Sequence, residues 1–596
     1  MTERADCTPN PPRTGLNAYN QPVVKPSISS RLVLFWQWAT PLGWCIALVF
    51  SITVFARAQT PAETGTAASG YGRILLVLPF DNRTGQPNLE WIREASAEIL
   101  SSRLASAGFA PMNRADRIYA LDHLGLPQGF HPSRASSLKL AETLDADSIV
   151  VGSYVTDGAG IVAEAQLVDV PHLRMGQAVT ARGEMRDLIS VFGSLAWKLT
   201  RQLDPEFKAS EETFVAAGSG LRLDAFEQYI RGISEPDQAE RLRHLNQSVL
   251  LSPEFSPAWM ALGREDYASQ QYEQAAEAFA KAGANNTGAG DALEAGFFRG
   301  LSLLFSGKYA SAENAFAGVA RQLPLAEVLN NQGVALARSG KDGTPFFRQA
   351  IAADPDGADY HFNLAVSLKR HGGNDTEALA ELAQCLRLKP NDSEAQTVQR
   401  AWSKQEKPGV AKAALSTAAT AALPVAGASQ PEEEADAKPD PLERIKRSFD
   451  SAAFHQAALM VDQVAASRLA ELPLRERAQK LSAQAQDYLD RGLLLEAERL
   501  YQSALAADPK AAEPHAGLAE LRERTGDIQA ARKEAVTSLE LLPSVQAYLV
   551  MVRLDLAAGH MDQVAYEMGE ALKIDPKSNA ALELQQQIDA KNKEKK

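Results

Sequence analysis

A repeat of helical patterns constrains this 596-residue chain more than any other feature. Pro509, Pro543 and Pro576 recur at intervals of 34 and 33 residues, and each follows two short runs with apolar residues at helical spacing. Two short amphipathic helices cannot bury their apolar faces alone, so units of this kind must stack on their neighbours. The periodicity therefore predicts a helical solenoid.

Two regions carry the pattern. In the second region, 478–577, the recurring positions are Leu481, Ala485, Tyr488, Gly492, Ala497, Tyr501, Ala504, then Leu518, Ala519, Gly526, Ala531, Ala535, then Tyr548, Gly559, Val564 and Ala571. In the first region, 222–391, the clearest unit contains Trp259, Leu262, Gly263, Ala275, Phe279 and Ala282. Weaker units surround it. Small residues at these positions would let paired helices approach closely, and proline would end the second helix.

These residues resemble the tetratricopeptide repeat family. The resemblance implies a mainly α fold, an α-α superhelical solenoid of about eight repeats in two arrays, after a small mixed α/β domain. It also implies that the inner face of the stack forms a groove for protein or peptide segments.

The first helix of each unit faces inward in that family. By register, the resemblance therefore places candidate groove residues on the first array: Met260, Arg264, Tyr267, Phe297, Leu301, Leu304 and Asn330. The alternative for Leu301 and Leu304 is that they belong to the core between repeats. Asparagine and lysine sets that hold a terminal carboxylate in some members are not evident, so we do not expect that ligand.

Residues 71–205 have a different pattern. Apolar runs at 73–78, 109–112, 148–155, 161–168 and 177–184 predict strands, and helical spacing predicts helices near 89–104, 114–123, 133–144 and 188–203. The order β-α-β-α-α-β-β-β-α is that of a small mixed α/β domain.

The run from Val77 to Asn82, then Leu89-Glu-Trp91, and later the run from Asp145 to Tyr154 resemble the amino-terminal α/β domain of the periplasmic TolB protein. In that family the domain is a binding module without catalytic residues, which implies a second envelope protein as a partner here. Asp81 and Asn82 follow a strand, where ligands often bind. We expect them instead to build a turn and cap the next helix.

The N-terminal 58 residues predict export. Residues 32–55 contain no charged side chain, Arg31 precedes them, and Ala56-Arg57-Ala58 follows them. A basic flank, an apolar core and small residues two apart are typical of a signal peptide, here cut after Ala58. The alternative is an uncleaved single membrane anchor, since 24 residues can span the apolar layer of a bilayer. Both place residues 59–596 outside the cytoplasm, in the periplasm or on the inner membrane.

Three further segments complete the organisation. Residues 405–440 are rich in Ala and Pro and predict a flexible linker. Residues 442–472 suggest a divergent helix pair that precedes the second array. Residues 578–596 suggest a polar capping helix and a basic tail.

Charge and motif content argue against several classes of function. The formal net charge of −13 repels phosphate, so we expect no nucleic acid partner. No phosphate-binding loop, nucleophile elbow or paired-histidine metal motif appears, so we expect no catalytic residues, no cofactor and no metal. Cys385 lies on an amphipathic helical pattern and suits a small core residue.

The main hypothesis is thus a non-enzymatic scaffold or adaptor of the bacterial cell envelope. One rival is a signalling sensor whose α/β domain binds a small ligand and passes that state to the repeats. Another is a hydrolase with an unrecognised site.

Overall fold

The computed structural model describes residues 73–127, 131, 133–217, 220–284, 289–372, 375–405, 441–448 and 467–594. The predicted signal peptide or anchor at 1–58 and the predicted linker beyond Gln405 lie outside these residues. Among the residues described, no helix is both long and apolar enough to cross a membrane.

The α/β region is built on one mixed sheet. Its strands are β1 (Ile74–Val77), β2 (Asp81–Asn82), β3 (Ala110–Pro111), β4 (Ser148–Asp157), β5 (Gly160–Asp169), β6 (Arg174–Met175) and β7 (Val179–Glu184). The order is β3-β1-β4-β5-β6, with β2 also paired to β4 and β7 to β5. β1 runs parallel to β3 and β4, whereas β5 runs antiparallel to its neighbours β4 and β7.

Helices cover both faces of this sheet. They are α1 (Ile92–Ser106), α2 (Arg114–His123), α3 (Arg134–Thr143) and α4 (Leu188–Leu203), followed by the short α5 (Glu211–Ala216). Alternate residues of a strand point to opposite faces. Leu75 and Val77 accordingly pack in one cluster with α1 and α4, while Leu76 packs in another with α2 and α3. This explains why the β1 sequence is apolar throughout.

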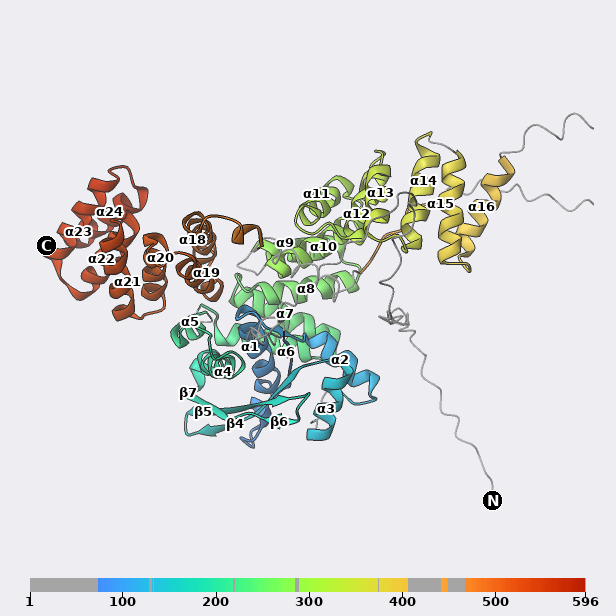
Figure 1. Cartoon of the computed structure of the whole chain (residues 1–596). Helices are drawn as coiled ribbons and strands as arrows, with labels where there is room; N and C mark the ends of the chain where they lie inside the picture. Colours follow the sequence, from blue (N-terminus) through green and yellow to red (C-terminus); the bar gives the residue numbers. More distant parts are fainter. Residues whose placement is uncertain are drawn as a thin grey trace, which may run out of the picture. The chain divides into compact units, whose positions relative to one another are not determined.

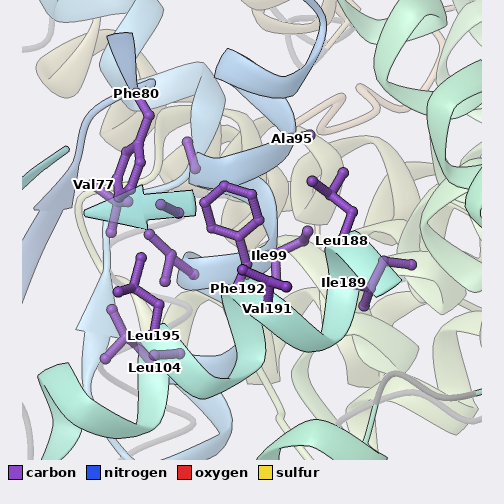
Figure 2. Packing of buried hydrophobic residues seen from close by; sticks show 14 of the residues in the cluster. Val77, Phe80, Ala95, Ile99, Leu104, Leu188, Ile189, Val191, Phe192 and Leu195 are labelled. Carbon is purple, nitrogen blue, oxygen red and sulfur yellow. The ribbon is translucent and has the colours of Figure 1, made fainter. Parts of the chain in front are cut away.

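Figure 2 shows the core beneath α1 and α4, with Val77, Phe80 and Phe192 among the labelled side chains. The rings of Phe80 and Phe192 meet edge to face, with centroids 5.7 Å apart. The mixed α/β region expected from the sequence is therefore present. The short strand β2 is an addition, because Asp81 and Asn82 pair with β4 rather than forming only a turn.

The first helical region contains five antiparallel helix pairs and one further helix within its described residues (Figure 1). The pairs are α6 (Leu223–Ser234) with α7 (Gln238–Leu251), α8 (Ser256–Ala268) with α9 (Tyr272–Ala284), α10 (Ala289–Phe305) with α11 (Tyr309–Ala320), α12 (Ala326–Arg338) with α13 (Thr344–Ala353), and α14 (Ala358–Arg370) with α15 (Asp375–Leu388). α16 (Ser393–Gln405) follows them, and its Ala395, Val398 and Trp402 join the core.

Close helix approach depends on glycine opposite an aromatic ring. A Cβ added at Gly300 would lie 2.7 Å from the Phe316 ring, and one at Gly333 would lie 2.8 Å from the Phe347 ring. Any larger residue would push the two helices apart. Ala275, which the sequence pattern placed at a helix crossing, is fully buried, and so is Ala312 of the next helix pair.

The second helical region repeats the arrangement with three pairs. They are α18 (Leu474–Asp490) with α19 (Leu494–Ala507), α20 (Ala512–Arg524) with α21 (Ile528–Leu541), and α22 (Val545–Ala558) with α23 (Met561–Ile574); α24 (Asn579–Glu594) follows. The fold is therefore mainly α, with eight helix pairs in two arrays among the residues that the structure describes.

One expectation needs correction between the arrays. Residues 442–472 were predicted to form a helix pair; residues 467–470 are helical, but residues 442–448 carry no helix. Residues 449–466 of that prediction lie outside the described part of the chain. The reason is tertiary: residues 441–448 lie against the first array and make their hydrogen bonds with its side chains.

Candidate peptide-binding groove

The segment 441–448, with the sequence PLERIKRS, lies along α12, α14 and α16. Of these helices, α12 carries Asn330, one of the residues that the sequence predicted to face inward, and the other predicted residues lie on α8 and α10. We call the surface they present to the segment the groove. The described part of the chain thus contains a groove and an occupant drawn from its own sequence.

Two asparagine side chains pair with the main chain of the segment. Asn363 receives a hydrogen bond from the Arg444 N–H at 2.6 Å and donates one to the Arg444 carbonyl at 2.8 Å. Asn331 does the same with Lys446, at 2.9 Å and 2.7 Å. Residues 444 and 446 are two apart, which is the periodicity of an extended chain. The asparagines therefore act as the neighbouring strand of a sheet would.

Asn330 connects the two pairs. It is fully buried, donates to the Arg444 carbonyl at 3.0 Å, and accepts from Asn363 at 2.7 Å. Its amide also donates to the Asn331 side-chain oxygen at 3.2 Å. A buried amide without partners would destabilise the fold, so the row of three asparagines depends on the segment for part of its hydrogen bonding.

The side chain of Arg444 enters an acidic pocket. Its guanidinium donates two hydrogen bonds to Asp392, at 2.6 Å and 2.9 Å, one to Asp359 at 3.1 Å, and two to Glu394, at 2.9 Å and 3.3 Å. The planar group also lies 3.7 Å above the centre of the Phe362 ring. A two-point carboxylate bond with aromatic stacking favours arginine over lysine here.

Lys446 and Arg447 extend this charge pattern. The Lys446 ammonium donates to Asp359 at 2.8 Å and lies 5.0 Å from the centre of the Tyr360 ring. The Arg447 guanidinium lies 5.2 Å from the centre of the Phe305 ring. Aromatic faces attract cations, so these contacts add to the preference for a basic segment.

Glu443 reverses the polarity at the other end. Its residue is only 2% exposed, and its carboxylate pairs with Arg370. Arg370 also donates to the Pro441 carbonyl at 2.7 Å, and Arg338 donates to the Glu443 carbonyl at 3.0 Å. The groove thus offers a cationic end for an acidic residue and an acidic end for basic ones, which fixes the direction of the segment.

The pKa values in the acidic pocket are shifted by the occupant. Burial raises the pKa of Asp392, but the hydrogen bonds and charge of Arg444 lower it more, so the pKa lies below its usual value. The same holds for Asp359, with Lys446 as the main opposing cation. Burial lowers the pKa of Arg444, but its hydrogen bonds to Asp392 and Glu394 raise it more, so this pKa lies above its usual value. All these groups are therefore charged at neutral pH.

The sequence-predicted groove residues divide into three groups. Asn330 hydrogen-bonds the segment. Phe297, Leu301 and Leu304 are at most 1% exposed and belong to the apolar core, which is the alternative considered for the two leucines. Met260, Arg264 and Tyr267 lie on α8, where Arg264 pairs with Glu294 and the Tyr267 ring packs against Phe298.

Several groove residues were missed from sequence. A usable signal was present: Asn331 and Asn363 are 32 residues apart, and so are Arg338 and Arg370. Polar residues repeated at the interval of the helix pairs lie at equivalent places on successive first helices. That signal is short because it spans only two repeats, and Asp392 and Glu394 lay outside the array as the sequence pattern defined it.

The α/β region carries a second concave feature. A cavity of about 350 Å³ lies where the end of β1 meets α6 and α7, and Arg93, Arg114 and Arg117 line it together with Glu90 and Glu94. Arg93 pairs with Glu90 at 2.9 Å, and Arg114 with Glu94 at 3.2 Å. Within the residues described, no group of His, Cys, Asp and Glu has the geometry of a metal site.

Comparison with known proteins identifies the repeats. Residues 346–393 and 482–544 match the tetratricopeptide repeat family model, one stretch in each array. No curated protein matches the sequence. These two stretches include α14 of the groove and α20 of the second array.

Solved structures show partial likenesses only. YrrB, a TPR protein with an unusual peptide-binding site, is 16% identical over 35% of this chain and 99% of its own, with a TM-score of 0.26. MamA is 14% identical over 28% of this chain and 96% of its own, with a TM-score of 0.25. The C-terminal domain of LpoB from Salmonella enterica is 21% identical over 19% of this chain and 84% of its own, with a TM-score of 0.17. These scores are too low to carry an argument about function. The family match covers one stretch in each array, and the stacked helix pairs around these stretches have the same arrangement, so the chain contains tetratricopeptide repeats.

Proposed function

We propose that this protein is a non-enzymatic adaptor of the bacterial cell envelope, and that its first array holds an extended segment of a partner protein in the groove. One observation carries the proposal. Asn331 and Asn363 each bond both the N–H and the C=O of one residue in an extended segment. Such pairing recognises a backbone, so the groove suits any chain that can lie extended in it.

The experiment uses the full-length chain with residues 441–448 replaced by alternating glycine and serine, which we call the vacated chain. A labelled peptide with the sequence of residues 441–448 is titrated against it, and binding is followed by fluorescence anisotropy. We expect saturable binding that is about 100-fold weaker when Asn331→Ala and Asn363→Ala are added. Asn246→Ala is the control, because its amide bonds only to Leu242 on the exposed side of α7. A vacated chain that binds no peptide would refute the proposal.

The envelope location rests on the N-terminal sequence. Arg31, the uncharged run 32–55 and Ala56-Arg57-Ala58 have the order of a signal peptide or anchor. Cell fractionation with N-terminal sequencing tests it. A mature chain that begins at Gln59 would indicate cleavage, and an intact chain in the membrane fraction would indicate an anchor. An intact chain in the cytoplasm would contradict export.

Within this proposal the α/β region docks on a second envelope protein, and Met260, Arg264 and Tyr267 on α8 provide further contacts for a partner. Affinity capture with the full chain would test both. Losing one partner on substitution of Arg264 and Tyr267, but not the other, would separate the two surfaces.

The cavity beside β1 favours one second candidate, a sensor. Its arginines would suit a small anionic ligand, and α6 and α7 of the first repeat line it together with the α/β region. A panel of anionic metabolites in a thermal unfolding assay would test this. A ligand that stabilises the chain, and no longer does so after Arg93→Ala, would favour the sensor over the adaptor.

A further inference from the structure

The segment 441–448, which lies in the groove, indicates the kind of partner sequence that the groove would select. We infer that the partner segment is basic, with arginine two residues before lysine, and that residues 441–448 are a built-in competitor for it. This inference rests on the proposed function and adds the chemistry and the control of binding to it.

The argument for arginine begins with the acidic pocket. Three carboxylates, from Asp359, Asp392 and Glu394, surround one guanidinium. Asp392 is 7% exposed and lies just before α16, whereas Asp359 lies on α14, so the pocket is formed only where the last helix pair meets the helix that follows it. Carboxylates gathered in this way repel one another unless a cation lies between them. An empty pocket, or one that faces a neutral residue, would leave that repulsion uncompensated.

The lysine preference follows from the spacing. The Asn331 pair holds residue 446 two places after the residue held by Asn363, so alternate side chains fall on the same face of the groove. Asp359 forms ion pairs with both Arg444 and Lys446, so one carboxylate contributes to the binding of both cations. A segment with one cation, or with cations at adjacent positions, would satisfy Asp359 less completely.

The competition follows from covalent connection. Thirty-five residues, 406–440, join the end of α16 to Pro441, so the occupant is always attached to its own groove. A tether of this kind gives an effective concentration on the order of millimolar. A partner at micromolar concentration must then have an affinity about 1,000-fold higher than that of the segment in order to occupy half of the grooves. The tethered segment thus raises the partner concentration that is needed for binding.

The test compares two peptides on two forms of the full-length chain. The first peptide has the sequence of residues 441–448, and the second has alanine at the positions of Arg444 and Lys446. We expect the first peptide to bind the vacated chain at least about 10-fold more tightly than it binds the wild-type chain. We also expect it to bind the vacated chain at least about 10-fold more tightly than the second peptide does.

The outcomes separate this inference from the proposed function. If the vacated chain binds neither peptide, the proposed function fails. If it binds both equally well, the function stands and the selection of arginine and lysine is wrong. If the wild-type and vacated chains bind the first peptide equally, the segment is not a competitor. Because these comparisons change the peptide or a linker segment, they do not depend on a core substitution that could unfold the array.

A charge-reversal pair strengthens the assignment. Asp392→Arg in the vacated chain should abolish binding of the first peptide and favour a peptide with glutamate at the position of Arg444. Lys533→Ala is the control, as this exposed lysine lies on α21 of the second array. Light scattering on the wild-type chain supplies the last arm. A monomer is the expected result, whereas a dimer that the vacated chain no longer forms would show exchange between two copies and overturn the intramolecular competitor.

Discussion

In the first array, the residue nine positions before the turn glycine of a first helix is asparagine in two successive repeats, Asn331 before Gly340 and Asn363 before Gly372. In the second array the same position holds Gly517, before Gly526, and Val550, before Gly559. Val550 is fully buried, and a Cβ at Gly517 would lie 2.1 Å from the Tyr501 ring. The second array therefore has no amide at the place where the first array pairs with a backbone.

The polar side chains of the second array satisfy one another instead. Arg553 forms two hydrogen bonds of 2.6 Å with Glu523, and Gln546 donates to Glu520 at 2.8 Å and to Gln486 at 2.7 Å. Groups that already have partners lose those bonds when a ligand arrives. The comparison teaches that the repeat fold builds the stack, whereas a few positions on its first helices decide whether the stack grips a peptide.

Loss of the paired asparagines should have the largest effect. In the full chain, Asn331→Ala with Asn363→Ala removes the partners of both N–H groups, of Arg444 and Lys446, and of the Lys446 carbonyl, and leaves the Arg444 carbonyl with Asn330 alone. We expect these amides to lose at least about 100-fold of their hydrogen-exchange protection, or about 3 kcal/mol. Exchange with mass spectrometry measures this, with Asn246→Ala as control. Unchanged protection would mean that the asparagines do not hold the segment.

Placing asparagine, the residue of the first array, at the equivalent position 517 should destabilise the second array. Gly517→Asn places a side chain where the Tyr501 ring lies, so the helices must separate. We expect a loss of about 2–3 kcal/mol in urea unfolding followed by circular dichroism. The control is Gly569→Ala, because a Cβ at Gly569 meets nothing within 4 Å. Equal stability of the two variants would contradict the close approach at Gly517.

Neutralising one carboxylate of the pocket should weaken the segment less than removing both asparagines. Asp392→Asn keeps the shape of the side chain but removes the charge that faces Arg444. We therefore expect about a 10-fold loss of hydrogen-exchange protection at the backbone amide of Arg444. Because the pKa values of Asp359 and Asp392 are lowered, wild-type protection should persist at neutral pH and disappear as the pH falls through those lowered values. Protection that survives in strong acid would argue against the charge contacts.

The second array has a pH dependence of opposite sign. Burial and the neighbouring Asp555 carboxylate raise the pKa of Glu567 to about 7. Between the ordinary glutamate pKa and 7, the folded state binds more protons than the unfolded state, so its stability falls as the pH rises through this range. Glu567→Gln should remove this trend and stabilise the array by about 1 kcal/mol at pH 8. Urea unfolding at pH 5 and pH 8 would check it, and a trend that persists in the variant would contradict this assignment.

The thiol of Cys385 can report on opening of the first array without a substitution in its core. Burial raises the pKa of Cys385 to about 11, and this residue packs in the core of the first array. With Cys7→Ser and Cys45→Ser, it is the remaining cysteine of the sequence. Iodoacetamide at pH 8 should modify it at least about 100-fold more slowly in the folded chain than in urea. Fast modification of the folded chain would show that the first array opens readily.

Much of the fold could be read from the sequence because its signals are local. Helical spacing of apolar residues and prolines after the second helices predicted stacked pairs, and the structure contains eight of them in its described residues. The strands from Ser148 and Gly160 and the helix from Leu188 lie where apolar periodicity placed them. The extension of the first array by α16 was missed, because that helix is polar apart from Ala395, Val398, Ala401 and Trp402.

The candidate site was less predictable. Inward positions were assigned by register, which cannot separate a residue that faces the groove from one that faces the next repeat. Asn330, assigned in this way, hydrogen-bonds the segment, whereas Leu301 and Leu304 are buried in the core. Residues 442–448 were expected to belong to a divergent helix pair over 442–472. Residues 442–448 are not helical in the structure, because side-chain amides and guanidinium groups on α12 and α14 bond the backbone groups that a helix would use.

The sequence by itself determined the class of architecture: an α/β region followed by repeated helix pairs, with small residues wherever two helices cross. Those features depend on neighbours in the chain, so periodicity records them. Only the tertiary structure decided that Asn331, Asn363 and Asp392 meet around residues 444 and 446. The physical reason is that solenoid stacking places residues about 30 positions apart on one surface, where their combined hydrogen bonds and charges hold an extended segment that none of them could hold alone.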